Sequence, residues 1–399
     1  MESIKSRATD LRILHVYRTY FPDSQGGLEE VIRQICLGTA PHKIQSRVLS
    51  VSSDPEIRSR ATKRVVRLQE AAVYRAKQTF EIASCNVSID AFRMHRRLAD
   101  WADVVHYHFP WPLADLLRLS SPKNKPSVLT YHSDIVRQRV LGALYWPLMN
   151  RFLSSVDRIV CTSPNYFATS DVLSRFESKV DVIPIGIDAN TYPEPSVTKL
   201  DELRSGFGTE FFLFVGVLRY YKGLHILIDA IKDAKYDVVI VGSGPTEQAL
   251  RAQATRMGLN NVKFTGHVSD ETKVGLFHLA RGVVFPSYLR SEAFGVTLLE
   301  GAMYGKPLIS TEVGSGTSHV NIDGETGLVV TPGSSKDLRH AMDQLHFRPD
   351  MARLMGQRAR ARYEQLFTGA LMGSKYVALY RDLTGNPTSA GRQPAAKSA

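Results

Sequence analysis

Short apolar runs alternate with amphipathic stretches through the first half of the chain. The runs that predict β-strands cover residues 11–17, 46–52, 104–108, 127–132, 158–162 and 179–184. Helical patterns separate them, and this alternation is typical of a parallel sheet with helices on both faces. The pattern stops at residues 185–188, and the following segment TYPEPSVTK contains two prolines and no periodicity. We therefore predict a domain boundary near residue 187.

The same alternation restarts in the second half. Predicted strands cover residues 211–217, 237–241, 262–265, 282–286 and 307–311, with helices at 223–231, at 246–257 and from about Phe294, and a helical region at 336–383. A second doubly wound parallel sheet follows from this pattern. The predicted domains are an N-terminal Rossmann-like domain (1–187), a C-terminal Rossmann-like domain (188–367), a helix at about 368–384 that can pack back on the first domain, and a disordered tail (385–399).

The composition is that of a globular protein that can form two cores. The chain has 399 residues, of which 43% are hydrophobic and 22% charged. We find no apolar run long enough to cross a bilayer and no signal peptide, so a cytoplasmic location is expected. Three widely spaced cysteines, Cys36, Cys85 and Cys161, argue against a disulfide framework or a zinc site and are interpreted as buried thiols. The net charge of +11 favours an anionic partner, although the basic stretches at 58–67 and 93–97 can equally be solvated faces.

Glycine-rich loops after predicted strands are the first places to look for a ligand, because ligands of open parallel sheets bind where strand ends meet helix N-termini. Gly26 and Gly27 lie between a strand and a helix, where backbone N–H groups can approach a diphosphate. Gly242 belongs to a tight GSGP turn that lacks the third glycine of GxGxxG and the lysine of a P-loop. Both glycine-containing sequences are also common in ordinary turns that bind no ligand.

Two further segments carry charged residues suited to a diphosphate and to a diol. Arg219 and Lys222 follow a buried strand, where their positive charges can bind a diphosphate. Alternatively, they are part of a solvated loop. Glu292 precedes a helix start, and Glu300 lies about two turns deeper, where a carboxylate suits a ribose diol. The expected diphosphate amides belong to the first residues of that helix, Phe294, Gly295 and Val296.

The segment SEAFGVTLLEGA resembles the family-four retaining glycosyltransferases of the GT-B fold, whose hallmark is two glutamates separated by seven residues. GGLEE, TYHSD, IPIGID, VGSGP and FTGHVS also resemble family landmarks in the expected order, and the last of these adds His267 and Val268 as donor-binding positions. The family's usual arginine, five residues before the lysine, is Val217 in this chain. Arg219 stands three residues before Lys222, and LRYYKG resembles mannosyl- and rhamnosyltransferases of bacterial O-polysaccharide assembly.

The resemblance implies transfer of a hexose, favoured as mannose or rhamnose, from a GDP-sugar to a polysaccharide or lipid-linked glycan. It also implies that residues 1–187 form the acceptor-side domain and residues 188–367 the nucleotide-sugar-binding domain. It assigns Glu292 to donor-sugar hydroxyls, Glu300 to the ribose, and His132, from the other domain, to the sugar or its phosphate. Arg219 and Lys222 are then expected to stabilise the departing diphosphate. The sequence has no Asp-x-Asp pair, so no metal and no other cofactor are expected. The resemblance also implies a reaction on one face of the sugar, for which closure of the two domains would assemble the site.

Two other features have competing interpretations. His106 and His108 are expected on opposite faces of their strand, which argues against a shared metal site and leaves His108 as the one nearer the cleft. The amphipathic segment 135–152, with Trp146 among arginines, suggests peripheral docking on the anionic inner face of the plasma membrane, or an ordinary buried helix interrupted by Pro147.

The sequence leaves three alternative functions. A nucleotide-sugar 2-epimerase of GT-B fold would bind the same donor but needs additional acid and base groups. A basic nucleic-acid-binding protein would be expected to carry aromatic residues within its basic runs, and RSRATKRVVR has none. An inactive glycosyltransferase-like subunit is disfavoured because Glu292, Lys222 and Glu300 are all present.

Overall fold

The computed structural model describes residues 10–54, 64–82, 85–121, 125–134 and 139–385, apart from the side chains of 139–144. The chain forms two compact units. Unit 1 comprises Met1–Thr162, Asp171–Ile183 and Gly369–Ala399, and unit 2 comprises Ser163–Ser170 and Pro184–Thr368. The predicted tail falls almost entirely in residues 386–399, and part of the predicted basic stretch falls in residues 55–63; both lie outside the described residues.

Unit 1 is built on an eight-stranded sheet with the order β10-β9-β8-β7-β1-β2-β4-β3. All neighbouring strands are parallel except β3, which pairs antiparallel with β4. The strands are β1 (Leu11–Val16), β2 (Ile44–Ser52), β3 (Val65–Arg67), β4 (Ala72–Lys77), β7 (Val104–Phe109), β8 (Ser127–Tyr131), β9 (Arg158–Cys161) and β10 (Val180–Val182), and β5 (Phe80–Ile82) and β6 (Cys85–Val87) form a separate hairpin. The expected parallel sheet is confirmed, whereas β3 and β4 are additional.

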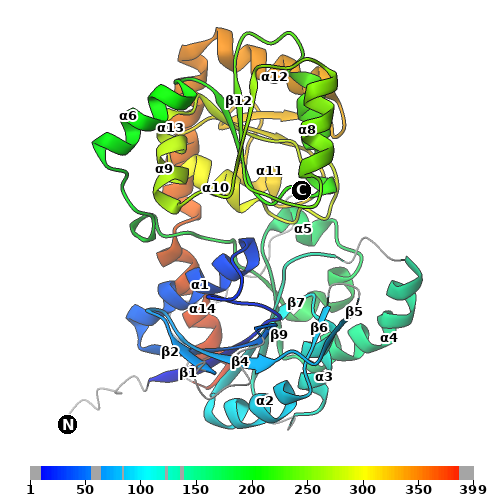
Figure 1. The fold of residues 1–399 in the computed structure, drawn as a ribbon. Coiled ribbons are helices and arrows are strands. Elements are labelled where there is room, and N and C mark those ends of the chain that lie inside the picture. The colour runs from blue at the N-terminus through cyan, green and yellow to red at the C-terminus, as the bar shows by residue number, and fades with distance from the viewer. Residues whose placement is uncertain (1–9, 55–63, 83–84, 122–124, 135–138, 386–399) are drawn as a thin grey trace, which may run out of the picture. The chain divides into compact units, whose positions relative to one another are not determined.

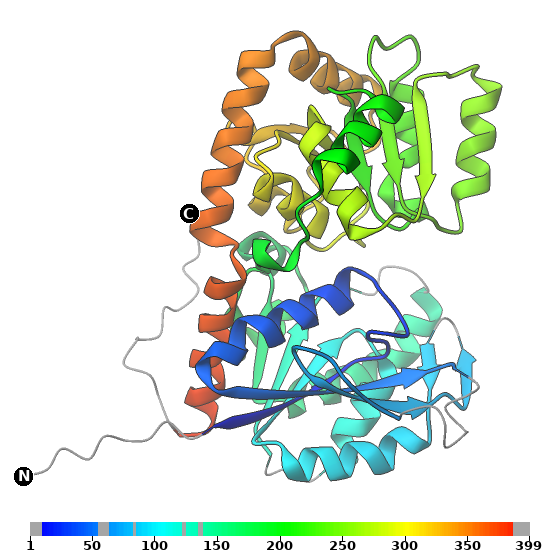
Figure 2. The same cartoon turned by 60° about the vertical axis from the view of Figure 1, so that its left-hand side comes forward.

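Helices cover both faces of this sheet. They are α1 (Gly27–Thr39), α2 (Asp90–Trp101), α3 (Pro112–Leu119), α4 (Arg139–Ser155) and α14 (Gly369–Leu383), with 3-10 turns at Ala40–His42 and Leu173–Lys179. In Figure 2, α1 and α14 lie side by side on one face and α2 lies on the other. The approach of α1 and α14 is close, since a Cβ on Gly38 would lie 2.5 Å from the carbonyl oxygen of Gly369.

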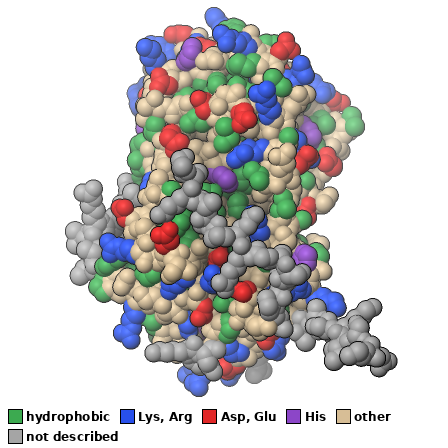
Figure 3. Space-filling model, turned by 180° about the vertical axis from the view of Figure 1, so that it is seen from behind, with side chains coloured by type: hydrophobic (Ala, Val, Ile, Leu, Met, Phe, Trp, Pro, Cys, Tyr) green, Lys and Arg blue, Asp and Glu red, His purple; other side chains and the backbone are tan. Residues whose placement is uncertain are grey.

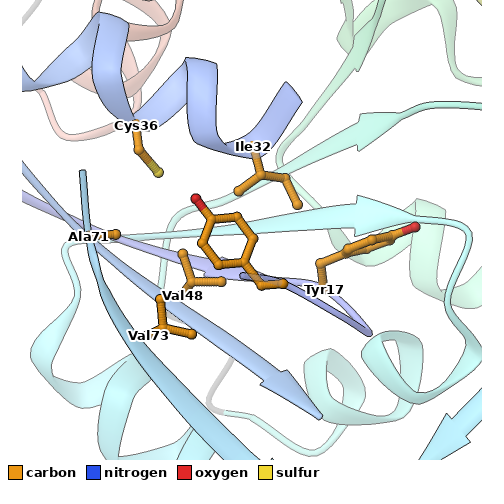
Figure 4. Packing of buried hydrophobic residues seen from close by; sticks show 7 residues of the cluster. Tyr17, Ile32, Cys36, Val48, Ala71 and Val73 are labelled. Atoms are coloured by element: carbon orange, nitrogen blue, oxygen red, sulfur yellow. The ribbon is translucent and has the colours of Figure 1, made fainter. Parts of the chain in front are cut away.

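The core between α1 and the sheet follows from helical periodicity. Ile32 and Cys36, one turn apart on α1, point toward Val48 of β2 and Val73 of β4 (Figure 4). The thiol of Cys36 is therefore buried, as is that of Cys161, but Cys85 is only half-buried. The expectation of three buried thiols was wrong for Cys85, because it belongs to the short β5–β6 hairpin at the surface.

Unit 2 has a six-stranded, wholly parallel sheet in the order β13-β12-β11-β14-β15-β16. The strands are β11 (Phe212–Val215), β12 (Val238–Val241), β13 (Val262–Gly266), β14 (Gly282–Phe285), β15 (Leu308–Thr311) and β16 (Gly327–Val330). The chain order reverses between β11 and β14, which is where open parallel sheets bind ligands. Helices α8 and α13 lie on opposite sides of this sheet (Figure 1).

The remaining elements of unit 2 are mostly helical. They are α5 (Pro164–Ala168), α6 (Val197–Phe207), α7 (Leu224–Ala230), α8 (Glu247–Arg256), α9 (Asp270–Leu279), α10 (Val296–Met303), α11 (Thr317–Val320), α12 (Ser335–Phe347) and α13 (Pro349–Leu366), with 3-10 turns η4 (Ala189–Thr191) and η5 (Tyr220–Lys222). The helical region expected at 336–383 is thus three helices. Pro349 begins one of them, because proline fits the first turn of a helix but not its interior.

On the face shown in Figure 3, basic and acidic side chains are intermixed. Arg93, Arg96 and Arg97 are exposed along α2. None of the helices in the described part of the chain combines the length and the hydropathy that crossing a bilayer requires.

Candidate functional site

The loops that follow β11 and β14 form the centre of the site in unit 2. Lys222 closes η5 after β11, and Glu292 lies in the loop between β14 and α10. The Tyr288 amide donates a hydrogen bond to the Tyr221 carbonyl at 3.0 Å, which joins the loop after β14 to the loop after β11. Two residues that are 70 positions apart in sequence are thereby brought together at the point where the strand order reverses.

Lys222 and Glu292 form an ion pair with both side chains about nine-tenths buried, at 12% and 10% exposure. The Ser287 hydroxyl donates a second hydrogen bond, 3.2 Å long, to the same carboxylate oxygen, Oε2. The Lys222 ammonium also lies 4.6 Å from the centre of the Phe285 ring. Among the described residues Glu292 Oε1 accepts no hydrogen bond, so this oxygen is free for a ligand.

The start of α10 lies beside this pair. Gly295 is the N-cap, with a left-handed φ of 86°, so the helix begins at Val296 rather than near Phe294 as expected. The Thr297 hydroxyl donates to the Val215 carbonyl at 2.9 Å and holds the helix start against the end of β11. The first N–H groups of a helix have no intrahelical acceptor, so the amides of Gly295 and Val296 are suited to an anion.

Glu300 lies deeper in α10 and is also buried. Its Oε1 accepts hydrogen bonds from the Lys273 ammonium at 3.0 Å and from the Tyr192 hydroxyl at 3.1 Å. Burial by itself would lower the pKa of Lys273, but the charges of Glu300 and Asp270 outweigh it and raise that pKa above its ordinary value. Glu300 Oε2 makes no hydrogen bond within the described part of the chain, so it can accept one from a hydroxyl group.

The glycine turn after β12 supports the loop that carries the cations. A Cβ on Gly242 would lie 2.1 Å from the carbonyl oxygen of Gly216, and one on Gly244 would lie 2.5 Å from that of Leu218. Gly242 also has a φ of 120°, which side-chain-bearing residues rarely adopt. Close backbone packing therefore requires these glycines. Arg219, in the supported loop, is exposed, and its guanidinium makes no ion pair with the described residues.

His267 and Val268 follow the last residue of β13. The His267 side chain is exposed and Val268 is half-buried. The Gly242 amide donates to the Gly266 carbonyl at 2.8 Å, which places this segment next to the turn after β12. No side-chain bond joins either residue to Lys222, Glu292 or Glu300 in the described residues, so both lie in a neighbouring loop rather than in the central cluster.

In unit 1, the Gly26–Gly27 turn precedes α1. Gly26 is its N-cap, and a Cβ there would lie 2.7 Å from Glu29 Oε2, whereas a Cβ on Gly27 would meet nothing within 4 Å. Glu29 is buried and accepts hydrogen bonds of 2.8 Å from the Thr19 and Ser24 hydroxyls. Glu29 therefore stabilises the turn through its hydrogen bonds to Thr19 and Ser24, and the space beside Gly27 is open.

His132 directly follows β8 and is buried beside other histidines. Contrary to expectation, His106 and His108 share one face of β7, with ring centroids 4.3 Å apart. The expectation was wrong because side chains alternate with a period of two, so residues two positions apart point the same way. His15 Nδ1 lies 3.1 Å from His108 Nε2, and His108 Nδ1 lies 3.0 Å from His132 Nε2.

The described part of the amphipathic segment belongs to unit 1 and packs against its other elements. Met149 and Phe152 of α4 are buried, and the Tyr145 hydroxyl donates a hydrogen bond to Asp115 of α3. Trp146 is half-buried, with the Arg175 guanidinium 4.8 Å from its ring centre. Residues 135–138 of the segment lie outside the described residues. These contacts favour the interpretation as a domain helix.

Sequence reasoning missed the residues that hold the predicted ones in place. Lys273, Tyr192 and Ser287 contact the two glutamates, and Glu29 braces the glycine turn. None of them belongs to a recognisable spacing. The only available signal was the need of a buried carboxylate for a charged or hydrogen-bonding partner, which predicts that a partner exists but not which residue it is.

Comparison with known proteins fits this geometry. Residues 200–362 match the model described as "Glycosyl transferases group 1", and residues 25–191 match "Glycosyltransferase Family 4". The chain is 54% identical over 358 residues to the D-rhamnosyltransferase WbpZ of Pseudomonas aeruginosa, covering 90% of this chain and 92% of that protein. It is 46% identical over 373 residues to the O-antigen chain mannosyltransferase C of Escherichia coli, covering 94% and 99%.

Solved structures show the same fold at low sequence identity. The sucrose-phosphate synthase of Thermosynechococcus elongatus superimposes with a TM-score of 0.76 at 20% identity, covering 94% of this chain and 99% of that one. Anabaena HepE in complex with UDP-glucose superimposes with a TM-score of 0.74 at 19% identity, covering 93% and 100%. The two parallel-sheet units thus have the GT-B fold of nucleotide-sugar glycosyltransferases. The chain belongs to glycosyltransferase family 4 and is a glycosyltransferase, and nothing in these comparisons supports an epimerase or a nucleic-acid-binding protein.

Proposed function

We propose that the chain is a retaining, metal-independent hexosyltransferase that transfers mannose or D-rhamnose from a GDP-sugar to a growing, lipid-linked O-polysaccharide. The names of the two relatives described above, a D-rhamnosyltransferase and an O-antigen mannosyltransferase, support the sugar and the acceptor. The observation that carries the proposal is the buried Lys222–Glu292 pair beside the start of α10, where cation, carboxylate and free amides converge.

The diphosphate would bind to Lys222, Arg219 and the first amides of α10. Breaking the glycosidic C–O bond leaves negative charge on the departing phosphate, and preorganised cations and amides stabilise that charge. Lys222 would then exchange its contact with Glu292 for one with the diphosphate. The released Glu292 carboxylate, still held by Ser287, would accept hydrogen bonds from donor-sugar hydroxyls.

The ribose would bind at Glu300. Its free Oε2 can accept a hydroxyl hydrogen bond while Oε1 remains fixed by Lys273 and Tyr192. Lys273 and Tyr192 hold the Glu300 carboxylate in one orientation, because both donate hydrogen bonds to Oε1. The nucleoside is thus held before the sugar reacts, which directs binding energy to the positioning of the reacting carbon.

The transfer step would take place on one face of the sugar. The acceptor hydroxyl oxygen forms a bond to the anomeric carbon as the bond to the diphosphate oxygen breaks, and the acceptor proton passes to that departing oxygen. No side chain has to act as a nucleophile, so Glu292 serves as a positioning carboxylate. The cations supply the charge stabilisation that a divalent metal would otherwise supply, which is the reason for proposing metal independence.

The acceptor side of the proposal rests on unit 1. The turn at Gly27 has open space above it, and the arginines of α2 form an exposed basic row. Such a row is attracted to anionic lipid headgroups, where a lipid-linked acceptor would reside. We propose cytoplasmic function with peripheral contact to the membrane through this row rather than through the packed part of α4.

Glu300→Gln tests the donor site. In thermal unfolding with a panel of GDP-mannose, GDP-rhamnose and UDP-glucose, the GDP-sugars are expected to stabilise the unmodified chain most. The substitution removes the charge that the ribose hydroxyls contact, so the Kd for the preferred donor should rise about tenfold, equivalent to a charged hydrogen bond of roughly 1.5 kcal/mol. Titration calorimetry gives the same constant independently.

The matched control is Glu247→Gln, which alters a half-buried carboxylate paired with Arg251 on α8. It should leave the donor Kd unchanged. Stabilisation by none of the nucleotide sugars would contradict the proposed function, and equal Kd values for the Glu300→Gln and unmodified chains would contradict the ribose assignment alone.

A further inference from the structure

Three histidines of unit 1 form a continuous hydrogen-bonded chain across neighbouring strands. His15 lies on β1, His108 on β7, and His132 directly after β8. The two nitrogen-to-nitrogen distances, 3.1 Å and 3.0 Å, are hydrogen-bond lengths. His108 uses both of its nitrogens in the chain, whereas each of the two terminal histidines uses one.

Burial keeps these rings neutral. It lowers the pKa of His15 and of His132 to about 3 and that of His108 well below its ordinary value, where the nearby histidines lower it further. A neutral imidazole has one N–H donor and one bare acceptor nitrogen. The direction of one bond in the chain therefore fixes the direction of the next, and all three rings must share the same tautomer.

The two ends of the chain differ in their surroundings. His15 Nε2 and His132 Nδ1 are buried and have no partner among the described residues. The His15 side chain is 0% exposed and lies beneath neighbouring rings, while His132 retains 2% exposure at the end of its strand. An N–H group buried without an acceptor is costlier than a bare acceptor. We therefore expect the proton at the His132 end, because His132 directly follows β8, and the carboxyl ends of parallel strands are where a ligand can supply the acceptor.

We propose that His15 and His108 are positioning residues that hold His132 in the Nδ1–H tautomer, so that His132 donates a hydrogen bond to a substrate oxygen. The identity of that oxygen rests on the proposed function; the tautomer does not. His132 in this state cannot accept a proton at Nδ1, in agreement with a transfer step in which the departing phosphate oxygen takes the acceptor proton.

A bound metal ion is the competing explanation for clustered histidines. Ligand nitrogens of His15, His106 and His108 do lie within 4.8 Å of one another. However, His106 Nδ1 bonds the Tyr380 hydroxyl at 2.8 Å and its Nε2 bonds Thr130 Oγ1 at 2.7 Å. Both nitrogens of His108 are also engaged, so a metal ion would have to break existing hydrogen bonds at two of the three rings.

Long-range ¹H–¹⁵N correlation spectra of the ¹⁵N-histidine-labelled full chain, without ligand at pH 7, test the proposal directly. His15, His108 and His132 are expected to be neutral, with the proton on Nδ1 in each. A different tautomer in any one of the three, a doubly protonated ring, or stoichiometric binding of added Zn²⁺ that shifts their nitrogens would overturn it. Because no donor is added, this result is independent of the proposed function.

His108→Phe interrupts the chain at its centre while preserving an aromatic ring. His132 is then expected to populate both tautomers, and kcat to fall in proportion to the Nδ1–H population that is lost, about twofold if the two tautomers become equally populated. The control is His95→Phe, since His95 is also buried but bonds Tyr107 and Ser121 outside the chain. It should leave the His132 tautomer unchanged. A His132 tautomer unaffected by His108→Phe would contradict the positioning role, and the spectra of the unmodified chain decide the matter if that variant does not fold.

Discussion

Lys222→Met is expected to reduce kcat by about two to three orders of magnitude, equivalent to roughly 3 to 4 kcal/mol of lost transition-state stabilisation. The ammonium is nearly buried, lies over the Phe285 ring and contacts Glu292, so the departing diphosphate would meet it where water screens it poorly. Methionine keeps the volume and removes the charge. Steady-state release of nucleoside diphosphate measures the loss, with donor Kd measured in parallel to separate binding from turnover.

A double-mutant cycle with Glu292→Gln tests whether the two residues act together. Because the proposed roles of Lys222 and Glu292 serve one bond-breaking step, the double variant should be little slower than Lys222→Met alone. Lys199→Met, which alters a lysine on α6 paired with Glu202, serves as the control and should leave kcat unchanged. Fully additive losses in the cycle, or a Lys222→Met enzyme of near-normal kcat, would contradict the assignment.

Gly242→Ala should destabilise unit 2 by about 2 to 4 kcal/mol and lower its melting temperature by roughly 5 to 15 °C. Two penalties combine at this position, the φ of 120° and a Cβ placed 2.1 Å from the Gly216 carbonyl oxygen. Relief of the clash must displace the loop from Gly216 to Lys222. Donor affinity should therefore fall as well, although Gly242 itself would not need to touch the donor.

The matched control for this prediction is Gly258→Ala. Gly258 also has a positive φ, 65°, but its Cβ would meet no atom within 4 Å. The substitution should lower the free energy of unfolding of unit 2 by only about 1 kcal/mol and leave donor affinity unchanged. Differential scanning calorimetry with and without donor compares the two variants, and equal melting temperatures would show that backbone proximity at Gly242 is unimportant.

Much of the architecture could be predicted because buried parallel strands are continuous apolar runs. The strands that carry the site, β11, β12 and β14, were all expected within two or three residues of their observed ends. In contrast, β4, with the sequence AVYRAK, contains two cations that interrupt its apolar pattern, and one of them, Arg75, is buried only because it pairs with Asp23 and Asp54. Such compensation depends on tertiary contacts and has no local signature.

The site could be predicted to the level of its motifs but not of its contacts. The motif placed Glu292 just before a helix and Glu300 about two turns inside it, and the strand-end position of Lys222 placed it near a ligand. The pairing of Lys222 with Glu292, and of Lys273 with Glu300, depends on the order of the strands in the sheet, which the sequence pattern does not specify. The shared face of His106 and His108 was missed through an error in strand periodicity, whereas the chain from His15 through His108 to His132 also depends on the order of β1, β7 and β8 in the sheet.

In the proposed reaction, unit 2 binds a nucleotide sugar whose hexose the chain transfers to a glycan acceptor. The most direct measurement follows label from GDP-[¹⁴C]mannose or GDP-[¹⁴C]rhamnose into the lipid-linked glycan fraction of a membrane extract, in the presence of a chelator. We predict acceptor-dependent incorporation, one GDP released per sugar transferred, and its near-complete loss in Lys222→Met. Conversion of the donor to another nucleotide sugar without incorporation, or incorporation that Lys222→Met leaves unchanged, would contradict the account.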